Sequence, residues 1–210
     1  MSVVEFGLLA LSSLFVIVDP IATVPAFVTM TADSPVPERQ RMAKVACIVA
    51  CLLMLVFGAV GNALFRFLGI TIPAFQMAGS VVLLLVALDM VRAQRSKVQE
   101  TFEEKEAGTA KEDIAVTPLA VPMLAGPGAI STVILLHTKA DDWRKQLALG
   151  GAIVVVCGVS YAVLAVSARG MRWLSPIALR VAERVMGLLL AAIAFQFLIN
   201  ALTQLKIIPK

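Results

Sequence analysis

Long apolar segments are the feature that most constrains how this chain can fold. Six of them, each about 20 residues or longer, cover residues 6–30, 42–66, 70–91, 115–137, 147–168 and 181–203. A helix of roughly 20 apolar residues crosses the hydrocarbon core of a bilayer. Of the 210 residues, 60% are hydrophobic and only 15% are charged, whereas soluble domains have about a quarter charged. The sequence therefore predicts an integral, multi-pass membrane protein.

The segments are predicted to be helices rather than strands of a barrel. Residues 81–88 read VVLLLVAL, without the alternation of apolar and polar side chains that a membrane-spanning strand requires. The predicted fold is therefore all-α, with six transmembrane helices in a single membrane domain. The net charge of +4 comes from basic residues at loops and span ends, so it does not indicate nucleic-acid binding.

The chain divides into two halves of three spans each. Residues 1–91 form the first predicted repeat, 92–114 a charged linker and 115–210 the second repeat. With three spans per half, the second half enters the membrane from the opposite side, which predicts a 3+3 inverted repeat. Twelve basic residues fall on the side of the linker and six on the other, so the linker is predicted to be cytoplasmic and both termini outside.

Asp19 lies inside the first apolar segment, where residues 18–25 read VDPIATVP. A carboxylate at this depth is costly and marks a functional site, and Pro20 and Pro25 are expected to break the helix beside it. A buried carboxylate can also exchange a proton near neutral pH. We therefore predict that Asp19 couples transport to protons or another ion. A helix-capping role, or direct contact with substrate or cation, are the alternatives.

The fourth segment is interrupted in the corresponding place, at Gly126-Pro127-Gly128. Free amides at the start of a half-helix form an anion site, which suits the carboxylate of an amino acid, and Ser131 and Thr132 add hydroxyl groups. The alternative is a tight helix crossing with a proline kink. Two interrupted spans in corresponding positions of two halves indicate the binding site of a transporter.

Other polar residues inside the segments are weaker candidates. Thr23 either faces the same cavity as Asp19 or bonds back to a carbonyl of its own helix. Gln76 and Gln196 either contact substrate or hold helices together by hydrogen bonds. The predicted substrate-binding set is Asp19, Pro20, Thr23, Pro25, Gln76, Gly126, Pro127, Gly128, Ser131, Thr132 and Gln196.

No metal site, cofactor or catalytic group is predicted. Cys47, Cys51 and Cys157 all fall inside apolar segments, where they are expected to act as small buried hydrophobic residues. Their odd number and the lack of a Cys/His cluster indicate neither a disulfide framework nor a zinc site. An aspartyl-type hydrolase would need a second carboxylate facing Asp19 at mid-depth, so an enzyme is not expected.

Two sequence strings are familiar: DPIATVPAFVTMT in the first segment and PLAVPMLAGPGAISTVILL in the fourth. With the glycine-bearing third and sixth segments, they resemble the MarC family of bacterial inner-membrane proteins, also grouped with six-span neutral amino acid transporters. The resemblance covers essentially the whole chain. The usual first motif resembles DPxGNxP, and this chain has Ala22 and Thr23 in place of Gly-Asn.

The resemblance implies a six-helix protein of the cytoplasmic membrane that carries small neutral amino acids with ion or proton coupling. Together with the interrupted segments, it makes a secondary transporter the leading hypothesis. The alternative is a membrane protein with a regulatory or assembly role and no transport activity. The partners expected are the lipid bilayer and a small neutral substrate, and the small-residue helix faces are compatible with a homo-oligomer.

Overall fold

The computed structural model describes residues 1–32, 34–92, 115–170 and 176–207, and these ranges contain helices and no strand. The predicted linker 92–114 lies outside them except for its first residue. The helices, in chain order, are α1 (Val3–Val18), α2 (Pro20–Met30), α3 (Val36–Leu68), α4 (Ile72–Arg92), the π-helix η1 (Ala115–Leu124), α7 (Pro127–Lys139), α8 (Trp143–Gly170) and α9 (Pro176–Gln204). Each predicted segment thus corresponds to one helix or to a broken pair of helices.

Local chemistry sets several helix ends. Ser2 and Glu5 form a reciprocal capping box at the start of α1, which satisfies two backbone amides there. α3 ends at Gly69, whose φ of 67° lies in the left-handed region that glycine adopts without steric cost. Its amide donates to Arg66 O at 3.2 Å and the next amide, of Ile70, donates to Phe65 O at 2.9 Å. These bonds close a tight turn that leads directly into α4.

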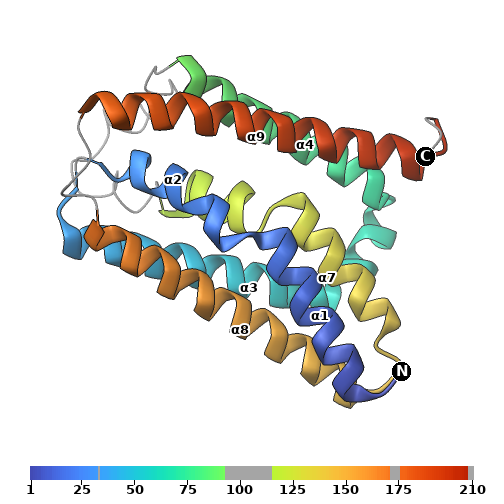
Figure 1. The fold of residues 1–210 in the computed structure, drawn as a ribbon. Helices are drawn as coiled ribbons and strands as arrows, with labels where there is room; N and C mark the ends of the chain where they lie inside the picture. The colour runs from blue at the N-terminus through green and yellow to red at the C-terminus, as the bar shows by residue number, and fades with distance from the viewer. Residues whose placement is uncertain (33, 93–114, 171–175, 208–210) are drawn as a thin grey trace.

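The helices form two groups (Figure 1). α4 and α9 run side by side along one edge of the molecule, while α1, α3, α7 and α8 form a bundle opposite them, with α2 and η1 between. The largest apolar core belongs to α1, α2, α3, η1, α7 and α8. A smaller cluster joins the α4–α9 pair to α2 and is made mostly of small side chains: Ala26, Leu83, Ala87, Leu190 and Ala194.

The outer surface and the helix lengths are those of a membrane protein. Among the described residues, four helical segments are long and apolar enough to cross a bilayer, and the pair Pro118–Leu124 and Pro127–Lys139, bent by 52°, makes a fifth. Ile72–Leu88 is a shorter apolar helix. Large aliphatic side chains such as Val16 (72% exposed) and Ile21 (67% exposed) cover the outside. The described part of the chain is therefore all-helical and polytopic, with the start of α1 and the end of α9 at the same end of the helices (Figure 1).

Candidate functional site

Asp19 is the residue at which the first membrane segment breaks. Its φ of 41° and ψ of 73° lie in the left-handed region, where Asp is one of the few residues enriched besides glycine. Its amide donates to Phe15 O at 3.1 Å and ends α1, while its Oδ1 accepts from the amide of Ala22 at 3.1 Å and caps α2. Pro20 follows at the first position of α2, where a missing amide hydrogen is tolerated. One residue therefore ends one helix and starts the next.

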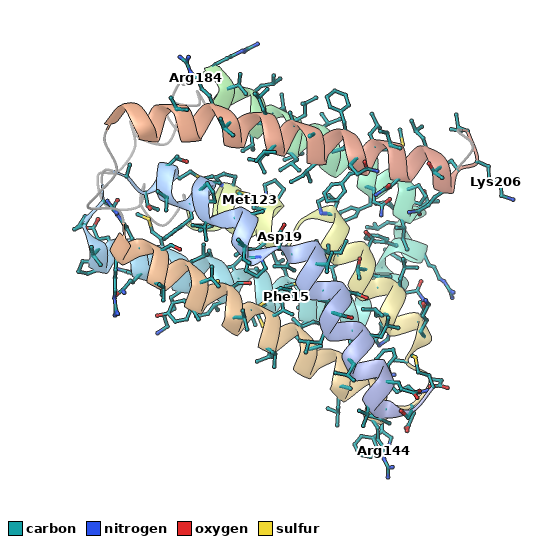
Figure 2. All side chains as sticks on the ribbon, viewed as in Figure 1. Phe15, Asp19, Met123, Arg144, Arg184 and Lys206 are labelled. Carbon is teal, nitrogen blue, oxygen red and sulfur yellow. The ribbon has the colours of Figure 1, made fainter. Side chains whose placement is uncertain are left out.

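Asp19 also lies halfway along the bundle and is exposed at its surface. Figure 2 shows it about midway between Arg184 and Lys206, which lie toward opposite ends of the molecule. Its neighbours Val18 and Pro20 are buried, whereas Asp19 itself is exposed, so the expectation of a buried carboxylate is wrong for the described structure. Because a carboxylate against hydrocarbon at this depth is costly, water, a cation or a polar partner has to meet it in the membrane.

The two other predicted residues of α2 serve the helix itself. Thr23 is buried, and its Oγ1 donates to Asp19 O at 3.0 Å, which is the back-bonded alternative for this side chain. Pro25 lies inside α2, which runs without interruption from Pro20 to Met30. The expectation that both prolines break the helix is therefore wrong for Pro25. One missing amide hydrogen bond is tolerated there because the rest of α2 keeps its bonds and packs against its neighbours.

The second break lies between η1 and α7. Gly126 is buried and extended, with φ −72° and ψ 172°, and it stands at the N-cap position of α7. A Cβ atom there would be 2.3 Å from Pro122 O, so no side chain fits. Since glycine has no capping group, the amides of Gly128 and Ala129 at the start of α7 have no helical partner and no side-chain cap.

The second break adjoins the first break and the α4–α9 pair. A Cβ atom built on Gly128 would lie 3.5 Å from Ile17 Cγ2, two residues before Asp19, and 2.8 Å from the ring of Phe197 in α9. A Cβ atom on Gly79 in α4 would lie 2.4 Å from Cγ of Pro127. Close backbone approach thus brings four helices together around the start of α7.

A chain of polar side chains runs from this point across the bundle, buried at Ser131 and Gln76 and exposed at Gln204. Ser131 in α7 is 1% exposed, and its hydroxyl donates to Pro127 O and accepts from Gln76 Nε2 at 3.0 Å. Gln76 in α4 in turn accepts, through Oε1, from Gln204 Nε2 of α9 at 3.2 Å. These bonds link α7, α4 and α9 in an otherwise apolar interior.

The remaining predicted residues lie at different places. Thr132 is half-buried, next to Ser131 in α7. Gln196 is exposed and donates to Asn200 Oδ1 at 2.9 Å within α9, so it takes no part in the bond between Gln76 and Ser131. Gln204 was not predicted because the sixth segment was expected to end at 203. The sequence did hold a signal for Gln204. It lies four residues after Asn200 and eight after Gln196, and residues at this spacing share one face of a helix.

The chemical groups gathered here are backbone amides, one hydroxyl, two carboxamides and, at the adjoining break, one carboxylate. Within the described ranges, no group of three or more His, Cys, Asp or Glu side chains is arranged to hold a metal ion. The gathered groups can donate and accept hydrogen bonds.

Comparison with known proteins agrees with this description. The sequence matches the family described as MarC family integral membrane protein over residues 4–206. A UPF0056 membrane protein of Methanocaldococcus jannaschii is 36% identical over 199 residues, which covers 94% of this chain and 96% of that protein. Another, from Aquifex aeolicus, is 34% identical over 204 residues, covering 96% and 95%. The UPF0056 membrane protein YhcE of Escherichia coli is 26% identical over 189 residues, which covers 90% of this chain and 88% of that protein.

No solved structure matches the chain. Because the family match spans nearly all of its length, the chain belongs to the MarC family of integral membrane proteins, as the two interrupted segments predicted.

Proposed function

We propose that this protein is a secondary transporter of small neutral amino acids or similar metabolites across the cytoplasmic membrane, coupled to protons or another ion through Asp19. The observation that carries the proposal is the closeness of two helix breaks about halfway along the bundle. One break presents a carboxylate, and the other presents free amides beside a buried hydroxyl. Paired discontinuous helices of this kind form the binding sites of secondary transporters.

The packing of the helices supports six spans arranged as a 3+3 inverted repeat. The proposed equivalent elements are α1–α2 with η1–α7, α3 with α8, and α4 with α9. α3 packs against α8 and α4 against α9, so equivalent helices meet each other. The contact of α1 with α8 in one half corresponds to the contact of η1 with α3 in the other. In the same way, the contacts of α2 with α8 and α9 correspond to the contacts of α7 with α3 and α4. Exchange of the two halves therefore conserves the main contacts, as a pseudo-two-fold axis requires.

The two breaks differ in a way that suggests where a substrate carboxylate binds. At α2 the carboxylate of Asp19 accepts from a backbone amide, whereas at α7 the equivalent position is Gly126, which has no side chain. We place the substrate carboxylate at the start of α7, in the role that Asp19 has at α2. Ser131, one turn into α7, and its hydrogen-bond partner Gln76 are the side chains that we expect to bond the rest of the molecule. The closeness of Phe197 to Gly128 favours substrates with small side chains.

Alternating access requires one group of helices to move against another. The α4–α9 pair is the candidate for the moving group, because small side chains and the bond between Gln76 and Ser131 join it to the bundle. The larger core of the remaining helices would stay fixed.

The test is uptake of labelled alanine and glycine by the purified protein in liposomes, with and without a proton gradient. We expect gradient-driven accumulation by the unmodified protein. Asp19→Asn keeps a good capping side chain, so this variant should fold and exchange substrate but lose gradient-driven accumulation. Gln196→Leu, outside the site, is the control and should accumulate substrate normally.

Full accumulation by Asp19→Asn would overturn the coupling role. Absence of uptake, together with no thermal stabilisation by any amino acid, would overturn transport and favour a regulatory or assembly role. Orientation is tested separately. The excess of basic residues on the linker side supports termini outside the cytoplasm, so a reporter enzyme that is active only outside should work when fused to the C-terminus.

A further inference from the structure

Three cysteines lie on α3 and α8, which pack against each other. Cys47 and Cys51 are four residues apart in α3 and share one face of that helix, and Cys157 lies in the middle of α8. Cys47 and Cys157 are buried, and Cys51 is half-buried. All three cysteines are free, and all three belong to, or pack against, the apolar core that α3 and α8 share.

The register of the two helices places Cys51 and Cys157 at about the same level. Gly58 lies two turns beyond Cys51 on the same face of α3, and Ile153 lies one turn before Cys157 on the same face of α8. α3 and α8 run in opposite directions (Figure 1). At one end, Val36 and Ala168 line the same cavity, which has a volume of about 410 Å³. Toward the other end, a Cβ atom on Gly58 would lie 4.0 Å from Ile153 Cδ1. Residues near the middle of α3 therefore face residues near the middle of α8, where Cys51 and Cys157 lie.

From this juxtaposition we propose that Cys51 and Cys157 are a redox-sensitive pair that forms a disulfide between α3 and α8 when a lipid-soluble quinone oxidises it. In this step two S–H bonds break and one S–S bond forms. The two electrons and two protons reduce the quinone to a quinol, so atoms and electrons balance. Facing positions on neighbouring helices are the first condition for such a bond, because two cysteines can be bridged only when their backbones are close and their side chains point together.

The position of the pair selects the class of oxidant. Ile48 and Leu52, which flank Cys51 along α3, are 48% and 57% exposed, and Val154 and Val155 of α8 are 54% and 50% exposed. These aliphatic side chains face the lipid in a membrane-spanning bundle. A small apolar quinone can approach through the lipid, whereas charged, water-soluble glutathione cannot enter this layer. The pair is therefore separated from the thiol buffer of the cytoplasm.

The experiment counts thiols in the purified full-length protein after treatment with a short-chain quinone in liposomes. The sample is denatured, labelled with maleimide and analysed by mass spectrometry. We expect three labelled cysteines before treatment and one, Cys47, afterwards, with all three restored by dithiothreitol. Cys47→Ser is the matched control, because it lies one helical turn from Cys51, and it should still lose both remaining thiols.

Cys51→Ser and Cys157→Ser should each keep both of their remaining thiols after the same treatment. These conservative variants change one sulfur to oxygen, and a thermal melt verifies that they fold. The proposal is overturned if three thiols survive quinone treatment, if peptide mapping finds Cys47 in the disulfide, or if the product is a cross-linked dimer. None of these readouts uses transport, so the result is independent of the proposed function.

Discussion

Replacing Gln76 by leucine should weaken the links from α4 to α7 and from α4 to α9. Gln76 bonds Ser131 in α7 at 3.0 Å and Gln204 in α9 at 3.2 Å, and Gln76 is only 8% exposed. Leucine fills a similar volume but removes both bonds, and it leaves the carboxamide of Gln204 without this partner.

The magnitude follows from the number of interhelical bonds. One such bond in a membrane protein contributes about 0.6 kcal/mol on average and at most about 1.7 kcal/mol. Two bonds give an expected loss of about 1–3 kcal/mol for Gln76→Leu. Ser131→Ala removes one of the two and should cost about half as much. For a chain of this length, 1 kcal/mol shifts Tm by about 2–4 °C, so the Tm of Gln76→Leu should fall by roughly 2–12 °C.

The assay is thermal unfolding of the purified protein in mild detergent, with Gln196→Leu as the matched control. Gln196 has the same side chain, but it is exposed and bonds only Asn200 of its own helix in the structure described here. Its replacement should change stability by less than about 0.5 kcal/mol. Equal Tm values for Gln76→Leu and Gln196→Leu would refute the assignment of the polar chain as a structural link between α4, α7 and α9.

Three further predictions concern the breaks and the surface. Gly79→Ala should destabilise the protein by about 1–3 kcal/mol, because the new methyl group would lie 2.4 Å from the rigid ring of Pro127. Gly151→Ala is the control: nothing lies within 4 Å of its new methyl group, so it should be neutral or stabilising, and a comparison of the two Tm values tests this. Asp19→Ala should be less stable than Asp19→Gly by about 1–2 kcal/mol, because glycine adopts the left-handed conformation of this residue freely and alanine does not. Equal denaturation midpoints for the two variants would contradict a left-handed backbone at position 19. The Lys145 ammonium, 2.5 Å from Asp141, lowers the pKa of that carboxyl. This pair therefore stabilises the folded protein at neutral pH, and its contribution is lost as the pH falls through the lowered pKa of Asp141. Because the pair lies at the surface, Lys145→Met should leave Tm at pH 7 nearly unchanged but should remove this pH dependence of Tm.

Features that depend on short stretches of sequence were predicted well. Asp19-Pro20 and Gly126-Pro127 mark the two breaks because proline at the first position of a helix, preceded by a cap or by glycine, acts within a few residues. Pro25 shows the limit of the same reasoning. Its missing amide hydrogen would break an isolated helix, but in α2 the packed environment retains the helical conformation.

The membership of the candidate site was predicted only in part, because side chains of different helices make it. Gln76 and Ser131 are 55 residues apart in sequence, and Gln204 and Gln76 are 128 apart. Gln196, which is as polar as Gln76, faces outward. Cys51 and Cys157 were expected to act as small buried hydrophobic residues, and only the antiparallel packing of α3 and α8 places them on facing sides of two helices.

The sequence by itself thus determined the class of protein, the helices and the positions of their interruptions, since hydrophobic length and the chemistry of Pro, Gly and Asp act locally along the chain. Only the tertiary structure decided which polar groups meet and which cysteines lie on facing sides of two helices. A bond between two helices depends on the rotation of each about its axis and on their register. Both are set by how glycines and alanines allow the helices to approach, and no single segment encodes that.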